Sequence, residues 1–97
     1  MVKIPETLEA LAVDIDSVRP FESNPRRGDV KAIAESLSAN GQYRPIVANK
    51  RTGEILAGNH TWQAAKSLGW PRIAVSWVDV DDETASRIVL VDNRLND

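Results

Sequence analysis

The stretch that decides the fold reads Glu54-Ile-Leu-Ala-Gly-Asn-His-Thr-Trp-Gln-Ala-Ala-Lys-Ser-Leu-Gly69. Its first apolar residues predict a short strand, and Trp62, Ala65 and Leu68 recur at the spacing of one buried helical stripe. Gly69 is expected to end this helix, because glycine adopts the left-handed conformation without strain. The pattern therefore predicts a strand, a two-residue turn and a helix.

The candidate functional residues lie in this turn and at the start of the helix. Asn59 is the expected N-cap, whose side-chain oxygen accepts from the amide of Thr61 or Trp62. The remaining amides and the helix dipole favour an anion such as phosphate, which Gly58 would let approach the backbone closely. His60 is the only histidine in the chain, and from the first helical turn its imidazole can reach the same anion. The alternative is an ordinary turn that binds nothing, with a histidine that serves packing or the surface.

Three further strands are predicted from apolar patterns. Residues 11–15 and 73–78 alternate apolar with other side chains, and the second run is expected to be buried on both faces at its centre. Residues 45–48 and 54–57 flank a five-residue connection, Asn49–Gly53, which predicts a hairpin. The second strand of this hairpin leads directly into the turn described above.

Two further helices are expected. Asp29 is the predicted N-cap of a helix that Asn40-Gly41 closes, and Asp81 or Asp82 caps a helix that reaches the last residue. The segment Ser17–Gly28 contains two prolines and no periodicity, which predicts an extended loop. Because no stop signal follows the last helix, we expect residues 1–97 to be one domain of a longer protein.

The three tryptophans differ in their expected roles. Trp62 and Trp77 are predicted to be core residues, since each falls on an apolar stripe of its element. Trp70 precedes a proline and fits either a core position or a surface on which a ligand stacks.

Composition excludes several classes of protein. With 97 residues, the chain is expected to form a single small domain with one core. It has no cysteine, which excludes disulfides and thiolate catalysis, and a lone histidine argues against a structural zinc site. It has no apolar run of about 18 residues and no charged-then-apolar leader, so we expect a cytoplasmic protein without membrane contact.

The formal net charge of −2 hides an uneven distribution. Residues 19–72 hold nine Lys or Arg against four Asp or Glu, whereas the flanks hold three against ten. This basic middle contains the turn, and its field would attract an anionic ligand. The alternative is that these charges are solvated and spread around the fold.

A series of short motifs runs in order from about residue 11 to residue 95. They are Asn24-Pro25-Arg26, Leu37 followed by Asn40-Gly41, Arg44-Pro45-Ile46-Val47, Leu56-Ala57-Gly58, Trp62, Ala64-Ala65, Leu68-Gly69 and Asp92-Asn93. This series resembles the ParB and sulfiredoxin superfamily, and most closely the ParB-like N-terminal domains, some of which are described as ParB-like nuclease domains. The resemblance implies a compact α/β fold with a small mixed sheet and about three helices.

The resemblance also implies that the glycine-containing turn binds a nucleotide, CTP in partition proteins and ATP in sulfiredoxins. Gly58 corresponds to the turn glycine of the family. Asn59, His60 and Thr61 stand where ParB proteins carry Glu-Arg-Arg, so two phosphate-binding arginines are replaced, and Gln63 replaces a third arginine. In sulfiredoxins this turn holds a catalytic cysteine, so sulfinic acid reduction is excluded in a chain without a thiol.

An acidic residue and three arginines complete the implied site. ParB proteins carry Glu-Asn-x-x-Arg after the last strand, and Asp92-Asn93 matches its first two residues, whereas Asn96 replaces its arginine. Asp92 is expected to hold Mg²⁺ through water, and the alternative is a polar residue on the outside of an amphipathic helix. Arg26, Arg27 and Arg44 are expected near the phosphates, since a guanidinium engages two oxygens at once, although each alone would suit a solvated surface.

Three functions fit these residues. The first is a nucleotide-binding regulatory module of a ParB-like DNA-binding or partition protein from a phage, plasmid or bacterial chromosome, which contacts DNA through other regions and self-associates as a homodimer. The second is an enzyme: a metal-dependent ParB-like nuclease, an NTPase or a small-molecule phosphotransferase. A metal nuclease needs clustered carboxylates, and the acidic run Asp79–Glu83 is such a cluster in the sequence. Its position at a strand exit and helix start is better explained by helix capping and by pairing with the helix dipole. The third is an interaction domain that binds no nucleotide.

Overall fold

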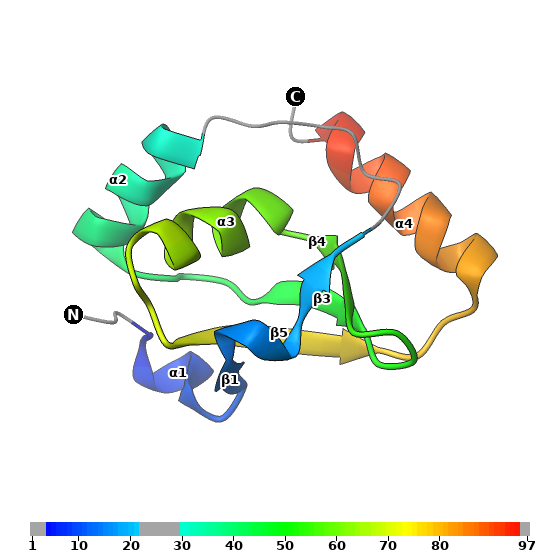
Figure 1. The fold of residues 1–97 in the computed structure, drawn as a ribbon, viewed down its shortest axis with the longest axis horizontal. Helices are drawn as coiled ribbons and strands as arrows, with labels where there is room; N and C mark the ends of the chain where they lie inside the picture. Colours follow the sequence, from blue (N-terminus) through cyan, green and yellow to red (C-terminus); the bar gives the residue numbers. More distant parts are fainter. Residues whose placement is uncertain (1–3, 22–29, 96–97) are drawn as a thin grey trace.

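The computed structural model describes residues 4–21 and 30–95, and within them five strands form one mixed sheet (Figure 1). The strands are β1 (Ala12–Asp14), β2 (Arg19–Pro20), β3 (Ile46–Asn49), β4 (Glu54–Ala57) and β5 (Arg72–Val78). Their order across the sheet is β1-β5-β3-β4-β2. The pairs β1/β5 and β3/β4 are antiparallel, whereas β5/β3 and β4/β2 are parallel. The predicted hairpin and the predicted α/β class are therefore confirmed.

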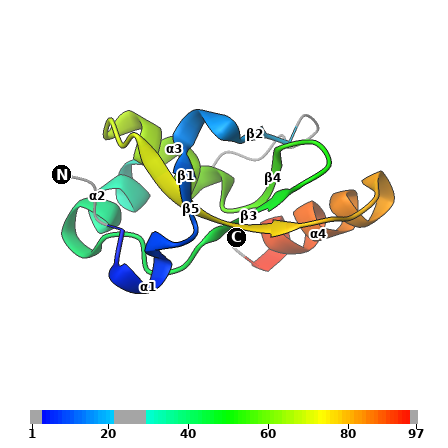
Figure 2. The ribbon, with the colours of Figure 1, turned by 90° about the horizontal axis from the view of Figure 1, so that it is seen from below.

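The two edge strands differ from the sequence prediction. β1 is shorter, because Ile15 opens a 3-10 helix, η1 (Ile15–Ser17), at whose start the Asp14 carboxylate accepts from the Asp16 amide at 2.9 Å. The segment predicted as a loop contains β2, which pairs with the start of β4 (Figure 2). Ser17 of that segment ends η1, whereas its residues 22–28 and the predicted cap Asp29 lie outside the described residues.

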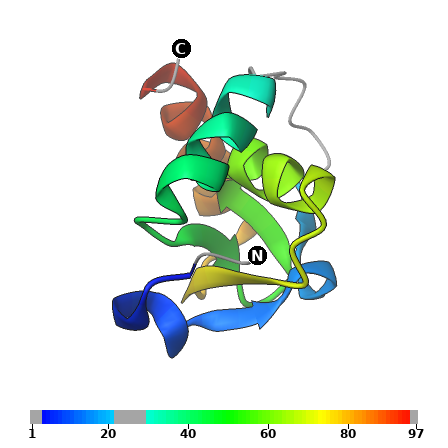
Figure 3. The ribbon, with the colours of Figure 1, turned by 90° about the vertical axis from the view of Figure 1, so that its left-hand side faces the viewer.

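Helices cover the sheet unevenly. They are α1 (Glu6–Glu9), α2 (Val30–Asn40), α3 (Asn59–Ser67) and α4 (Asp82–Leu95). α2 and α3 pack against each other (Figure 3), whereas α4 lies apart from them against β4 (Figure 1). α1 is additional to the three predicted helices and has no buried residue, which explains why no apolar period announces it. In the part of the chain described here, no helix has the length and apolar character that a membrane crossing needs.

Two hydrophobic clusters lie on opposite faces of β4. Successive side chains of a strand point to opposite faces, so Ile55 and Leu56 enter different clusters. Leu56 packs with Ala85 and Val89 of α4. The main cluster comprises Ile15, Val18, Leu37, Ile46, Ala48, Ile55, Ala64, Ala65, Trp70, Ile73 and Val75. β4 therefore lies between the main cluster, to which α2 and α3 contribute, and the cluster formed with α4. Packing on both faces fixes the position of the turn that follows β4.

The tryptophans resolve into three environments. Trp62 packs against the main cluster, and its indole N–H donates to the Ile15 carbonyl at 2.8 Å, which ties α3 to η1. Trp70 is buried in the core. The prediction of a core position for Trp77 is wrong: it is 40% exposed, because the end of β5 extends beyond the cover of α3 (Figure 1).

The end of α3 confirms one prediction and corrects another. Gly69 is left-handed with φ 79°, its amide donates to the Lys66 carbonyl, and the Trp70 amide donates to the Ala65 carbonyl, both at 3.0 Å. These bonds form a Schellman motif that ends the helix at Ser67. Leu68, predicted on the buried stripe, is 38% exposed because it is already at the C-cap.

Candidate functional site

The turn between β4 and α3 is held in place by Gly58. Its φ of 91° and ψ of 20° are left-handed, which disfavours every residue with a side chain. A Cβ added here would lie 2.5 Å from Cγ2 and 2.8 Å from Cβ of Ile46, so β3 leaves no room for one. The fold therefore requires glycine at position 58 whether or not a ligand binds there. That this residue also lets an anion approach stays a prediction.

The predicted N-cap at Asn59 is wrong. Asn59 is the first residue of α3, Gly58 is the N-cap, and the first intrahelical bond runs from the Trp62 amide to the Gly58 carbonyl at 3.0 Å. A residue already inside the helix cannot fold its side chain back to cap it, and α3 has no side-chain cap. The backbone amides of the first helical residues, 59–61, therefore have no acceptor within α3 itself, neither a helix carbonyl nor a side chain of the N-cap residue.

The side chain of Asn59 is buried instead, with 7% of the residue exposed. Its Oδ1 is the one buried side-chain oxygen or nitrogen in the described residues that has no hydrogen-bond partner. A buried acceptor without a partner is uncommon in folded proteins and calls for an explanation. Sequence reasoning missed this feature because it depends on the backbone of the turn.

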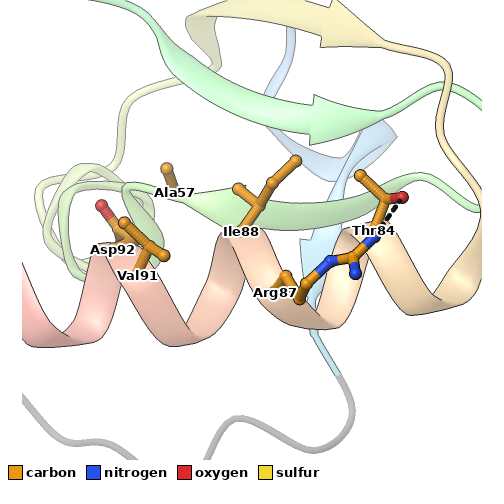
Figure 4. Close-up of a pocket in the computed structure, with 6 residues that line it drawn as sticks. All are labelled: Ala57, Thr84, Arg87, Ile88, Val91 and Asp92. Atoms are coloured by element: carbon orange, nitrogen blue, oxygen red, sulfur yellow. Dashed lines mark hydrogen bonds between the residues drawn. The ribbon is translucent and has the colours of Figure 1, made fainter.

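An open cavity of about 370 Å³ lies beside the turn, between β4 and α4 (Figure 4). Ala57, the residue before Gly58, forms one wall, and Thr84, Arg87, Ile88, Val91 and Asp92 of α4 line the other. Asp92 is half-buried there, so the structure brings the predicted metal residue to the same cavity as Ala57, the residue before the predicted phosphate turn, whereas Gly58, Asn59, His60 and Thr61 do not line it. The other α4 residues that line the cavity are three or four positions apart, as expected for one face of a helix. Once the inner face of α4 is known, this spacing is enough to identify them as lining residues.

The remaining predicted residues have unequal positions. His60 and Thr61 are half-buried in the first turn of α3. Arg44 is exposed and precedes by two residues the Ile46 that abuts Gly58, which places it at the same end of the sheet. Arg26 and Arg27 lie outside the described residues.

The acidic run Asp79–Glu83 at the start of α4 has structural roles, as its position predicted. Asp81 caps α4 by accepting from the Thr84 amide at 2.8 Å, and this hydrogen bond lowers the pKa of Asp81 below its ordinary value. Asp79 forms an ion pair with Arg51 and accepts a hydrogen bond from its guanidinium group. This hydrogen bond raises the pKa of Arg51. Glu83 contacts Arg87 at 3.4 Å. No three His, Asp or Glu side chains of residues 4–21 and 30–95 come together as a metal-binding group.

Comparison with known proteins gives consistent results. The family model of the ParB N-terminal domain matches residues 3–94. The chain is 27% identical to the nucleoid occlusion protein of Oceanobacillus iheyensis over 95 residues, which are 90% of this chain and 33% of that protein. The chain spans about a third of the length of the curated relatives it matches.

Two solved structures share the fold. The chromosome-partitioning protein ParB from Caulobacter crescentus, truncated at its C-terminus and complexed with CTP-γ-S, has a TM-score of 0.74 and 22% identity, covering 89% of this chain and 53% of that one. Sulfiredoxin from Arabidopsis thaliana has a TM-score of 0.64 and 23% identity, covering 80% and 93%. At these identities the likeness establishes the fold alone.

Proposed function

The chain belongs to the ParB N-terminal domain family, and we propose that it is a nucleotide-binding regulatory module of a ParB-like DNA-binding or partition protein. The phosphates of a nucleoside triphosphate bind at the start of α3, where Gly58, Asn59, His60 and Thr61 lie. The Caulobacter relative with the same fold is complexed with a CTP analogue, which favours CTP over ATP as the ligand.

One observation carries the proposal: the N-cap of α3, Gly58, has no side chain that could cap the helix, and the residue before it, Ala57, lines a cavity. Amides at an uncapped helix start point outward, and the helix dipole adds a partial positive charge, so the position suits a phosphate. Gly58, locked against Ile46, fixes the direction of these amides before any ligand arrives. Such preorganisation reduces the entropy that binding costs.

Most of the cavity lining is apolar, and Asp92 is its one carboxylate. Mg²⁺ prefers oxygen ligands, keeps several waters and usually binds proteins through one or two carboxylates together with substrate phosphates. Asp92 offers this carboxylate from the α4 side of the cavity. We therefore assign Asp92 to the hydrated metal that accompanies the triphosphate, where the metal neutralises phosphate charge.

Cationic side chains supply the remaining attraction in this proposal. Arg44 at the entrance of β3, Arg26 and Arg27 after the Asn24-Pro25 bend and, when protonated, His60 all favour an anionic ligand. DNA is contacted through regions beyond these 97 residues, and nucleotide binding alters self-association of the protein as a homodimer.

Isothermal titration calorimetry with CTP, ATP and ADP, each with and without Mg²⁺, tests the proposal. We expect a nucleoside triphosphate to bind in the presence of Mg²⁺ and His60→Ala to weaken it about fivefold, the loss of one hydrogen bond to phosphate. Arg72→Ala is the matched control, because Arg72 pairs with Glu9 of α1, and it should leave the affinity unchanged. Absence of binding at millimolar nucleotide would overturn the proposal and favour the nucleotide-free interaction domain.

The same samples separate binding from catalysis. Incubation with Mg²⁺ and a triphosphate, or with supercoiled DNA, reports diphosphate or nicked DNA if the domain is an NTPase or a nuclease. The regulatory reading predicts saturable nucleotide binding without nicked DNA. Nicking that depends on Asp92 would instead establish the nuclease alternative.

A further inference from the structure

The second half of β5 forms an edge of the sheet. β5 runs from Arg72 to Val78, but β1 pairs with it only at residues 72–74. The cover on this side stops at Leu11, just before β1, whose carbonyl accepts from the Val75 amide at 3.0 Å. Beyond Val75, β5 continues with β3 on one side (Figure 1). Among residues 4–21 and 30–95, no strand lies on the other side.

The backbone of Trp77 points outward from this edge. Successive residues of a strand direct their N–H and C=O groups to opposite sides. Val78 faces β3, because its carbonyl accepts from the Lys50 amide at 2.6 Å. Val75 faces away from β3, because its amide donates to Leu11. Trp77 shares the direction of Val75, so its N–H and C=O are open to pairing with a further strand.

This edge lacks the protection that sheet edges usually have. Proteins protect exposed edges with proline, charged side chains or very short strands. The opposite edge of the sheet follows this rule, because β2 consists of only Arg19 and Pro20, both exposed. Residues 76–78 contain neither proline nor charge. Trp77 is instead 40% exposed, and Leu11 beside it on the edge is 38% exposed, so open backbone groups lie next to two apolar side chains.

The charge around this edge discriminates between partners. The two segments that meet there, residues 4–18 and 73–83, hold four Asp or Glu each and no Lys, Arg or His. Four ion pairs of the described residues join Glu9 to Arg72, Asp16 to Lys66, Asp79 to Arg51 and Glu83 to Arg87. Eight acids against four bases leave an excess of negative charge. This charge repels nucleic acid, and a second copy of the chain would bring the same negative edge.

We propose that the edge of β5 at Trp77 is a docking site for an extended, basic segment of a partner protein. The segment adds a strand to the sheet through hydrogen bonds with the N–H and C=O of Trp77, and it packs an apolar side chain against Trp77 and Leu11. Its lysines or arginines face the surrounding carboxylates. The site is separate from the proposed nucleotide site: Trp77 pairs with Ala48 near the end of β3, whereas Gly58 abuts Ile46 at its start.

Nuclear magnetic resonance of the ¹⁵N-labelled full chain tests this proposal with synthetic peptides. The probe is a heptapeptide that alternates lysine and valine, and the control peptide alternates glutamate and valine. We expect the lysine peptide to shift the backbone amide and the indole N–H of Trp77 and to slow hydrogen exchange of that amide, while the amides of residues 58–62 stay in place. The inference is overturned if Trp77 does not respond to the lysine peptide, or responds equally to the glutamate peptide.

The apolar contribution is measured by fluorescence anisotropy of the labelled lysine peptide. Trp77→Ala is expected to weaken its binding about tenfold, because a tryptophan buried by a partner often supplies much of the binding energy. Leu90→Ala is the matched control: Leu90 is 65% exposed on α4, which packs on β4, and its loss should not change the affinity. Equal losses in the two variants would contradict the assignment of the site to β5.

The charge contribution is tested without altering the apolar side chains. Asp79 follows Trp77 by two residues and its side chain is exposed, so Asp79→Asn should weaken the lysine peptide about threefold. Glu35→Gln, at an exposed acid of α2, is the matched control and should leave the affinity unchanged. Unchanged affinity in Asp79→Asn would refute the basic character of the partner. A Trp77 amide shift that depends on protein concentration without peptide would assign the edge to a second copy and overturn the proposal.

Discussion

Gly58 shows how one residue can satisfy the fold and the proposed site together. It is left-handed, and Ile46 occupies the space where a side chain would begin. The backbone direction of the turn is therefore set by contact with β3. A ligand that binds the backbone amides after Gly58 would therefore find them already oriented by the fold.

Gly58→Ala should destabilise the domain by about 2 to 4 kcal/mol, because a left-handed alanine is strained and its Cβ overlaps Ile46. Chemical denaturation monitored by tryptophan fluorescence measures this. Gly69→Ala is the matched control: its φ is similar at 79°, but nothing lies within 4 Å of the added Cβ, so it should cost about 1 kcal/mol. Equal losses in the two variants would show that Ile46 does not restrict position 58.

For single residues, the sequence predicted local backbone conformation and helix capping better than side-chain burial. The left-handed Gly69 and the Asp81 cap follow from local chemistry that the sequence displays, whereas the predicted two-residue turn Gly58-Asn59 is wrong because α3 already begins at Asn59. The burial of Asn59 and the exposure of Trp77 do not, because the first depends on where α3 begins and the second on how far α3 covers β5. A shift of one residue in the start of α3 was enough to turn a predicted cap into a buried amide.

Among the elements, β3 is extended by a side chain. Before the strand begins at Ile46, the amide of Gln42 pairs with both backbone groups of Ala74 in β5 and so continues the ladder. Gln42 is buried, and so is Ala74. No local pattern announces such a bridge, since glutamine is usually exposed and its partner is 32 residues away.

Gln42→Ala should therefore destabilise the domain by about 2 to 4 kcal/mol, because it removes two hydrogen bonds and leaves a buried amide and carbonyl unpaired. Urea denaturation provides the measurement. Asn40→Ala, an exposed amide two residues earlier, should change stability by less than about 0.5 kcal/mol. A neutral Gln42→Ala would mean that water replaces both bonds.

The start of α4 should make stability depend on pH. The hydrogen bond from the Thr84 amide lowers the pKa of Asp81, so Asp81 contributes stability above the ordinary carboxyl pKa and loses it as the pH falls through its lowered value. Asp81→Asn keeps the cap but cannot titrate, and Asp81→Ala removes the cap.

Thermal unfolding between pH 7 and pH 2.5 checks this expectation. Asp81→Ala should have a lower midpoint than the wild type at pH 7, whereas Asp81→Asn should stay close to it. The advantage of the wild type over Asp81→Asn should shrink below about pH 4, as the carboxylate is protonated. Parallel curves for these two proteins across the whole range would refute the role of the charge.

Element prediction worked where the apolar period is long and failed where pairing decides. α2, α4, the β3–β4 hairpin and the doubly buried centre of β5 follow from their own residues. β2 is two residues long and exists because the start of β4 lies beside it, so no periodicity could identify it. The four residues of α1 are likewise too few to show a period.

For the whole molecule, the sheet order explains why a strand, a turn and two helices meet at one place. β4 carries Ile55 into the main core and Leu56 into the cluster under α4, so its last residue emerges between the two layers. The cavity opens there, with Ala57 on one wall and Asp92 on the other. Sequence reasoning predicted Gly58 from its own turn and Asp92, 34 residues later, from the family resemblance; the packing of α4 on β4 explains why Asp92 and Ala57, the residue before Gly58, line one cavity.

The most direct measurement of the central claim is the map of backbone amide shifts when CTP and Mg²⁺ are titrated into the ¹⁵N-labelled chain. We predict that the largest changes fall on residues 58–62, with smaller ones around Asp92, and that the far loop Lys50–Gly53 stays unchanged. Largest changes at that loop, or none anywhere at millimolar nucleotide, would contradict the assignment of the phosphate site to the start of α3.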